Sequence, residues 1–132
     1  MSKKFITFKQ PGQGSTLMFM HPLIVMVMFD MASWCNSRGI SFVVTDTIST
    51  IKKDKKLGRT SDSHRTRRAF DLRSRNFSSV EQQAFIKYFN SKYDQIASVS
   101  ESDLVSRLVD FHGEGDNLHF HISLHSRFRV NY

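Results

Sequence analysis

Two groups of residues in the second half of the chain combine side-chain types that bind metal ions and transfer protons. Six residues separate His64 from Asp71, and His119 and His121 flank Phe120 near the C-terminus. Side chains two residues apart on a strand point to the same face, which places the two late imidazoles about 7 Å apart. Imidazole and carboxylate groups are ligands of catalytic zinc, which keeps a further position open for water. Together the two groups predict a zinc site.

Zinc bound in this way supplies a nucleophile at neutral pH, because it lowers the pKa of a bound water toward about 7. A His or Asp that is not a ligand can then act as a general base beside the metal. The residue types therefore favour metal-assisted hydrolysis. Each group taken alone also has an interpretation without a metal ion. His119 and His121 could form a polar strand face, and His64 could lie in an ordinary surface loop.

The late His pair belongs to an alternating strand, in which Leu118, Phe120, Ile122 and Leu124 are expected on the buried face. A buried strand over 40–45 and a short strand over 69–72 are also predicted. Between them, residues 52–68 carry eight Lys and Arg residues and are expected to form a long basic loop. This loop would bring His64 to the sheet.

Helices are predicted to pack against these strands. Pro22 suits the first turn of an apolar helix that ends near Gly39. The capping box Ser78-x-x-Glu81 opens a helix that runs to about Tyr93. Ser100-x-x-Asp103 predicts another short helix through residues 104–109. We therefore expect an α+β fold with a small antiparallel sheet that carries the metal site and with two or three packed helices.

Length and composition indicate one folded domain. The 132 residues are enough for a single core, and 39% hydrophobic with 23% charged residues excludes a wholly disordered chain. We expect one domain over 1–132, with residues 1–20 as a partly extended N-terminal arm. The formal net charge of +7 favours an anionic partner such as nucleic acid, a cell-wall polymer or a membrane surface.

The single cysteine excludes an intrachain disulfide and any zinc site that needs several thiolates. Cys35 lies in an apolar segment and is expected to be inert core. We see no secretory signal peptide and expect synthesis in the cytoplasm. The apolar run 23–29 is far shorter than the ~20 residues of a membrane span. We therefore expect no membrane span, and a monomer.

The spacing of His64, Ala69 and Asp71, followed by a late His-x-His, resembles a known metal motif. It is similar to that of the D-alanyl-D-alanine carboxypeptidase and murein endopeptidase superfamily, which includes the hedgehog signalling fold. The family pattern is roughly S-x-H-x-x-G-x-A-x-D, followed by a C-terminal strand with the last His. Segment 116–124 resembles the ending of the penicillin-insensitive murein endopeptidases, in which two His residues flank an aromatic residue.

This resemblance implies a role for each of the candidate residues. The zinc ligands would be His64, Asp71 and His121. His119 would stand beside the metal as general base or oxyanion stabiliser. Asp116 would lie near the water.

A second alignment is possible within the same superfamily. Phage L-alanyl-D-glutamate endopeptidases end in D-x-P-H-F-E, which the segment from Asp116 to Phe120 also resembles, with Leu118 in place of the proline. In that alignment His119 is the ligand, Asp116 is the general base, and His121 is spare. The His-aromatic-His unit favours the first alignment because it matches as a whole.

The chain departs from the family pattern at several positions. Arg67 stands where the pattern has glycine, and Asp62 stands where it has serine. The S-G-Y-R-S segment of the family is absent. An arginine can bind a substrate carboxylate bidentately, so Arg59, Arg65 or Arg68 is expected to supply the missing contact.

The resemblance implies a zinc-dependent peptidase that hydrolyses an amide bond in peptidoglycan stem peptides, of the D,D-carboxypeptidase or murein endopeptidase type. Such an enzyme acts on the cell wall. The small size and basic charge would suit a phage lysis enzyme made in the host cytoplasm.

Two other functions remain open from the residues alone. His119-Phe120-His121 also satisfies the motif of His-hydrophobic-His endonucleases, which nick nucleic acid with a divalent metal and a nucleophilic Tyr. Tyr88, Tyr93 and Tyr132 are the candidates for that nucleophile. The third function is a non-catalytic basic binding module, although the basic segment 52–68 lacks the interleaved aromatic residues of stacking platforms.

Overall fold

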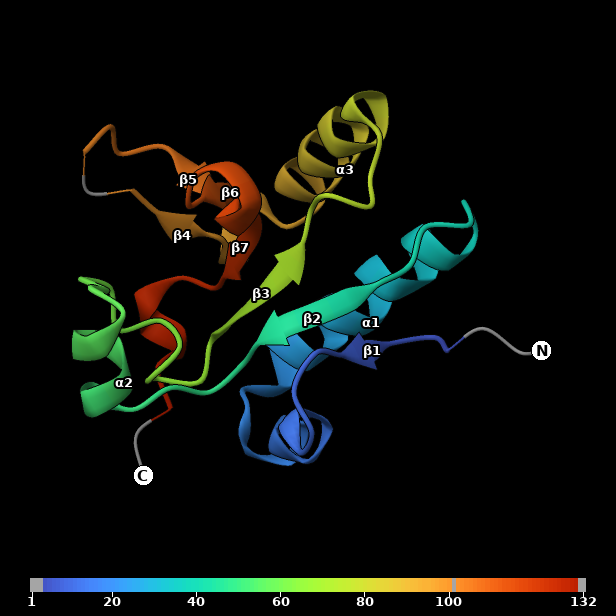
Figure 1. Cartoon of the computed structure of the whole chain (residues 1–132). Coiled ribbons are helices and arrows are strands. Elements are labelled where there is room, and N and C mark those ends of the chain that lie inside the picture. Colours follow the sequence, from blue (N-terminus) through green and yellow to red (C-terminus); the bar gives the residue numbers. More distant parts are fainter. Residues whose placement is uncertain (1–3, 101, 131–132) are drawn as a thin grey trace.

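A five-stranded sheet forms the centre of the computed structural model, which describes residues 4–100 and 102–130 (Figure 1). In spatial order its strands are β1 (Thr7–Phe8), β2 (Val43–Asp46), β3 (Ala69–Arg73), β7 (His119–Ser123) and β6 (Val109–His112). β1 and β2 pair in parallel, and the other pairs are antiparallel. Two further short strands, β4 (Ser98–Val99) and β5 (Ser106–Arg107), form a separate hairpin.

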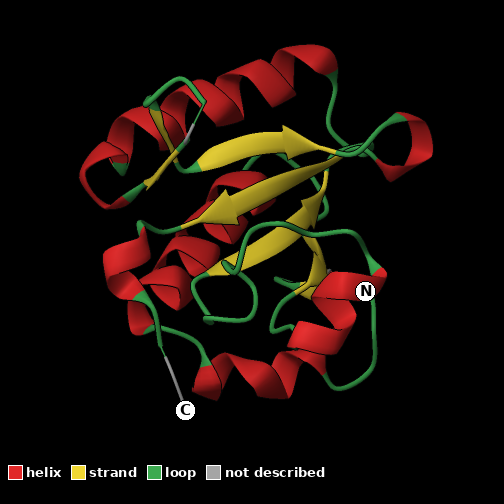
Figure 2. Ribbon diagram, turned by 90° about the vertical axis from the view of Figure 1, so that its left-hand side faces the viewer, coloured by secondary structure: helices red, strands yellow, loops and turns green. Residues whose placement is uncertain are grey.

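The described residues form three α-helices and four short 3-10 turns. The α-helices are α1 (Pro22–Asn36), α2 (Ile51–Lys56) and α3 (Ser79–Lys92). The 3-10 turns are η1 (Gln13–Phe19), η2 (Asp94–Ile96), η3 (Gly115–Asn117) and η4 (Ser126–Phe128). Figure 2 shows the twisted strands in the middle of the molecule, with helical segments around them. The predicted α+β class is confirmed, and the parallel β1–β2 pair makes the sheet mixed.

Both long helices begin at the signals that the sequence contains. Pro22 occupies the start of α1, where its missing N–H costs nothing, and the His21 Nδ1 atom accepts a hydrogen bond from the Leu23 amide. At α3 the capping box is complete. The Ser78 hydroxyl accepts from the Glu81 amide, and the Glu81 carboxylate accepts from the Ser78 amide.

α1 and α3 cover one face of the sheet and form the hydrophobic core with it. Phe120 of β7 packs against Phe85 of α3, with the two rings tilted, and Phe85 contacts Trp34 of α1. Cys35 is completely buried in this layer, as predicted. Asp30 of α1 accepts hydrogen bonds from Lys92 and Tyr93 at the end of α3, which ties the two helices together.

The opposite face of the sheet carries polar side chains in two neighbouring cross-strand rows. One row consists of Asp46, Asp71 and His121, and the other of Arg73, His119 and His112. Because side chains alternate along a strand, the same strands that bury their apolar residues against α1 and α3 present these polar residues to the other side. The candidate site residues Asp71, His119 and His121 therefore lie on this face.

Three predicted elements differ from the structure. The short helix predicted at residues 100–109 is wrong, because residues 98–99 and 106–107 pair as a hairpin and residues 109–112 join the main sheet. Asp103 accepts a hydrogen bond from Val105, and Leu104 adopts a φ of 59°. Ser and Asp side chains hydrogen-bond to nearby backbone groups in turns as well as at helix starts, so the Ser100-x-x-Asp103 pattern suits both.

The other two differences concern the basic segment and the strand faces. The basic segment 52–68 is not all loop, since α2 occupies its first part. Leu118, predicted on the buried face, is 40% exposed and precedes β7. No helix within residues 4–100 and 102–130 has both the length and the apolar character needed to cross a membrane.

Candidate metal centre and its cleft

The sheet brings Asp71 and His121 together. The two residues are direct partners in the β3–β7 ladder, and the Nδ1 atom of His121 lies 2.9 Å from the Asp71 Oδ1 atom. Residues directly opposite each other on one face of an antiparallel pair have their side chains in contact. Both side chains are buried.

His64 reaches the same carboxylate from the segment before β3. Its Nε2 atom lies 3.1 Å from the Asp71 Oδ1 atom. The backbone of this segment is held against the residues after β2, because the Ser49 amide donates to the His64 carbonyl. His64 is only 3% exposed. Its position therefore depends on loop contacts rather than on strand pairing.

Arg68 anchors the segment that carries His64. Its guanidinium donates to the Leu124 carbonyl at 2.6 Å, to the Asp62 carboxylate at 2.9 Å and to the Thr66 hydroxyl at 3.1 Å. Burial lowers the pKa of this guanidinium, although Asp62 acts to raise it. Arg68 thus joins the His64 segment to the residue that follows β7.

The second ring nitrogen of His64 defines its tautomer. Nδ1 lies 2.6 Å from the Thr47 carbonyl, which can only accept, so Nδ1 carries the hydrogen. In neutral His64 the Nε2 atom is then a bare lone pair that faces the Asp71 carboxylate. Only a proton on Nε2 or a cation between the two atoms makes this contact favourable. A ligand imidazole whose other nitrogen donates to a backbone carbonyl is typical of metal sites.

In His121, as in His64, one ring nitrogen faces the Asp71 carboxylate and the other ring nitrogen contacts a polar group outside the candidate ligands. Its Nε2 atom lies 3.2 Å from the Ser63 hydroxyl, while Nδ1 faces Asp71. Burial lowers the pKa of His121 to about 4, although hydrogen bonding to Asp71 acts in the opposite direction. The ring is therefore neutral at pH 7, which is the form that binds a metal ion.

His64, Asp71 and His121 form a buried group that can hold a metal ion. One ligand atom from each residue lies within 4.8 Å of the others. Burial acts to raise the pKa of Asp71, but hydrogen bonds with His121 and His64 outweigh it and hold the pKa well below its usual range. Two imidazoles and one ionised carboxylate suit catalytic zinc and also non-haem iron.

His119 stands next to this group without belonging to it. Its Nδ1–H donates to the Asn117 carbonyl at 2.8 Å, and its Nε2 atom lies 3.5 Å from the second oxygen of Asp71. The side chain is 23% exposed, so a ligand can reach it. His119 therefore presents a free ring nitrogen beside the candidate metal ligands.

Arg59 links the metal group to two other carboxylates. It contacts the Asp46 carboxylate at 2.6 Å, Asp54 at 3.4 Å and the second oxygen of Asp71 at 3.5 Å. Burial acts to lower the pKa of Arg59, but the hydrogen bond to Asp46 and the other carboxylates raise it overall. Lys53 of α2 also pairs with Asp46 at 2.7 Å. Arg59 thus holds Asp71 in place from the side of α2.

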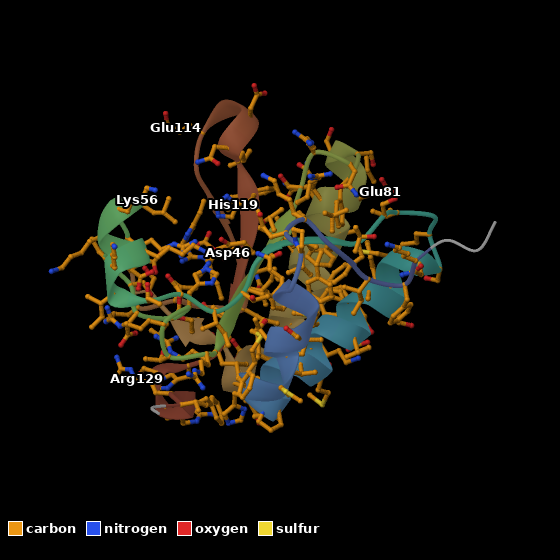
Figure 3. The ribbon with its side chains drawn as sticks, turned by 60° about the horizontal axis from the view of Figure 1, so that its bottom comes forward. Asp46, Lys56, Glu81, Glu114, His119 and Arg129 are labelled. Carbon is orange, nitrogen blue, oxygen red and sulfur yellow. The ribbon has the colours of Figure 1, made fainter. Side chains whose placement is uncertain are left out.

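An open cleft of about 620 Å³ leads to these residues. Its lining includes all of the candidate ligands and His119, together with residues 57–61. Figure 3 shows Asp46 and His119 between α2, which carries Lys56, and the turn that carries Glu114, whereas Glu81 on α3 lies away from them. The volume lies in the range of small-molecule sites.

The structure does not bring all of the predicted site residues into this cleft. Arg59 lines it, but Arg65 and Arg68 do not. Arg65 pairs at 3.7 Å with Asp54, and Arg68 is the buried anchor described above. Asp116 is exposed on η3 and lines a smaller side cavity next to His119.

Sequence reasoning missed several residues of the cleft. His112 of β6 stacks on the His121 ring, with the ring centroids 4.5 Å apart and the planes 7° apart. The alternation of Val109, Asp110, Phe111 and His112 is the signal that identifies this strand, and the predicted helix concealed it. Ser63, which lines the cleft, and Thr47, whose carbonyl accepts from His64 outside it, carry no signal that would single them out.

The tyrosines proposed for nucleic-acid nicking lie elsewhere. Tyr88 is on α3, and the Tyr93 hydroxyl at the end of that helix donates to Asp30 of α1. Neither residue lines the cleft. Tyr132 lies outside the residues that the structure describes.

The position where the peptidase pattern has glycine has an unusual backbone. Arg67 adopts a φ of 62°, in the left-handed region that favours glycine. Its carbonyl accepts a hydrogen bond from the His21 amide at 3.0 Å, which ties the turn to the start of α1.

Comparison with known proteins finds no family model, curated protein or solved structure that matches the chain.

Proposed function

We propose that this protein is a zinc-dependent peptidase that hydrolyses an amide bond in peptidoglycan stem peptides. The observation that carries the proposal is the convergence of His64, Asp71 and His121 in a buried group, with His119 beside it in an open cleft. Catalytic zinc sites have three protein ligands and one open position. When bound, zinc would polarise the scissile carbonyl and lower the pKa of a water toward about 7.

His119 is the group that takes the proton from the attacking water. Its Nδ1–H is committed to the Asn117 carbonyl, so Nε2 is the acceptor. The Asp71 carboxylate, 3.5 Å from Nε2, stabilises the imidazolium that results. His119 then returns the proton to the leaving amine. Its position in the main cleft favours His119 over Asp116 for this role.

The choice of substrate rests on the motif and is supported by one backbone feature. The left-handed φ of Arg67 falls at the glycine of the S-x-H-x-x-G-x-A-x-D pattern. Glycine adopts such a backbone without strain, so the agreement supports the resemblance to that pattern. Peptidoglycan stem peptides carry free carboxylates, which suit a chain with a net charge of +7. D,D-carboxypeptidase and murein endopeptidase activity are both compatible with this site, and a role in phage lysis would follow from either.

Metal content is the first test of the proposal. We expect about one zinc per chain in wild type by mass spectrometry after zinc loading and desalting, and a loss of zinc in the His64→Ala variant. His125→Ala is the matched control, because His125 caps η4 outside the cleft. Absence of zinc from the loaded wild type, or retention of zinc by His64→Ala, would disprove the proposed centre.

Activity is then measured on purified peptidoglycan. Zinc-loaded wild type should release new amino groups, and mass spectra of the fragments should identify the bond that is cut. His119→Ala should bind zinc as wild type does but lose most of the activity, because general acid–base catalysis contributes about 10²–10⁴-fold. Full activity in His119→Ala would remove that residue from the mechanism.

A further inference from the structure

A small side cavity opens beside His119. It has a volume of about 90 Å³ and shares Lys9, Thr45, Asn117 and His119 with the main cleft. A ligand bound in the main cleft can therefore extend into the adjoining side cavity. The cavity is next to the residue that handles the proton in the proposed reaction.

The side cavity is lined by cations that form no ion pair with any acidic residue that the structure describes. Lys9, Arg73 and Arg75 all line it. Within residues 4–100 and 102–130, no ion pair or side-chain hydrogen bond involves any of the three. Asp116 is the one described acidic residue in the lining, so the cavity has an excess of positive charge.

Four cations between residues 53 and 68 are different in this respect. Arg59 and Lys53 pair with Asp46, Arg65 pairs with Asp54, and Arg68 pairs with Asp62. Their charges are already balanced inside the protein. A ligand anion would have to compete with these carboxylates, whereas it meets no such competitor at Arg73.

Strand register places Arg73 at the reaction site. Arg73 is the direct cross-strand partner of His119 in the β3–β7 ladder, and it lies two residues after Asp71, so it is on the same face of β3. A guanidinium at this position can bind a carboxylate with two parallel hydrogen bonds. Lys9 lines the same cavity from the position after β1, and Arg75 lines it from the turn after β3.

We propose that the side cavity is an anion subsite that binds a carboxylate of the peptide substrate beside the scissile bond, with Arg73 as the main contact. This inference rests on the proposed function for the identity of the substrate. It assigns substrate recognition to Arg73, Arg75 and Lys9 rather than to the arginines of the basic segment. The anion-binding chemistry itself does not depend on the metal.

The test compares two peptides that differ only in one charge. N-acetyl-D-alanyl-D-alanine and its C-terminal carboxamide are titrated into the full chain, and dissociation constants are measured by NMR. Each titration is run with zinc and again with EDTA, because in EDTA the carboxylate cannot bind the metal. We expect the acid to bind about tenfold or more tightly than the amide in both conditions, as for a charge-assisted hydrogen bond.

Variants that remove one positive charge test which residue causes the preference for the acid over the amide. Arg73→Gln should bring the two dissociation constants to within about twofold of each other, whereas Lys87→Gln, which removes the same charge from the exposed surface of α3, should leave the preference unchanged. Arg75→Gln is the second variant in case Arg73→Gln does not fold, and it should weaken the preference in the same direction. Equal binding of acid and amide by wild type, or a preference that survives both variants, would overturn the subsite.

Three further outcomes distinguish a failure of the anion subsite from a failure of the proposed peptidase function. If inorganic phosphate shifts the Arg73 signals while neither peptide does, the cavity binds a free anion and the carboxylate proposal is wrong. If the chain binds no zinc but the preference persists in EDTA, the subsite stands and the peptidase proposal fails. If zinc binds and peptidoglycan is cut without any acid preference, the subsite fails and the peptidase proposal stands.

Discussion

Asp71 and His121 are direct neighbours across two strands, and 2.9 Å separates the carboxylate oxygen from the ring nitrogen. The sheet alone holds these two of the three candidate ligands. His64 comes from the turn before β3 and depends on side-chain and backbone contacts for its position. Substitutions that loosen this turn are therefore expected to weaken the metal centre without touching the metal.

Arg68→Met is expected to reduce both stability and zinc affinity. The change leaves the Leu124 carbonyl without its buried donor and removes one of the two arginines that pair with Asp62, which costs about 1–3 kcal/mol. Urea unfolding of the metal-free protein measures the loss. Arg129→Met is the matched control, because Arg129 pairs with the same Asp62 but is half exposed, and it should cost at most about 0.5 kcal/mol. Equal losses in the two variants would contradict the anchoring role of Arg68.

Ser63→Ala is expected to weaken zinc binding about tenfold, because it removes the hydroxyl that orients His121 through Nε2. The effect is measured by competition with a fluorescent zinc chelator. Ser33→Ala, at an exposed position of α1, is the control and should bind zinc as wild type does. Identical affinities in the two variants would show that His121 needs no support from Ser63.

His112 is expected to position His121 by stacking on it. An aromatic pair contributes about 0.5–1.5 kcal/mol, so His112→Ala should weaken zinc binding about two- to tenfold. His112→Phe keeps a ring at this position and should restore most of the affinity. A Phe variant as weak as the Ala variant would mean that the imidazole nitrogens of His112, and not its ring face, support the site.

Arg67→Gly is expected to stabilise the protein by up to about 1 kcal/mol. A left-handed backbone costs an L-residue about 1–2 kcal/mol, and the greater freedom of glycine in the unfolded chain offsets part of the gain. The Arg67 φ of 62° is the observation behind this prediction. Arg67→Ala keeps the strain and is the control. Thermal unfolding compares the three proteins, and a glycine variant less stable than the alanine variant would contradict the backbone argument.

Tyr93 is expected to make stability depend on alkaline pH. Burial and the hydrogen bond to Asp30 raise the pKa of Tyr93 to about 12, whereas an unfolded tyrosine has a pKa of about 10. The stabilisation is therefore fully present below pH 10 and is lost as the pH rises through about 12. Urea unfolding at several pH values should show a steeper alkaline loss in wild type than in Tyr93→Phe. Tyr88→Phe, on the same helix, should keep the wild-type slope.

Features that depend on neighbours along the chain could be predicted from the amino-acid sequence. Pro22 and the capping box at Ser78 and Glu81 mark the starts of α1 and α3, because a helix start is stabilised by groups within its first turn. The alternation around Phe120 predicts β7 for the same local reason. The residue types at His64, Asp71 and His121 were sufficient to suggest a metal site.

The way in which these elements meet could not be predicted from local sequence patterns. His119 and His121 share a strand face, and the sequence left open which of them joins Asp71; the β3–β7 register places His121 opposite it. The motif at Ser100 and Asp103 suits a helix start as well as a turn, and the pairing of β6 with β7 decided in favour of a turn. Likewise, Arg68 forms an ion pair with Asp62, whereas Arg73 lines the side cavity and forms no ion pair among the described residues. These outcomes depend on contacts between residues far apart in the chain, which local patterns do not contain.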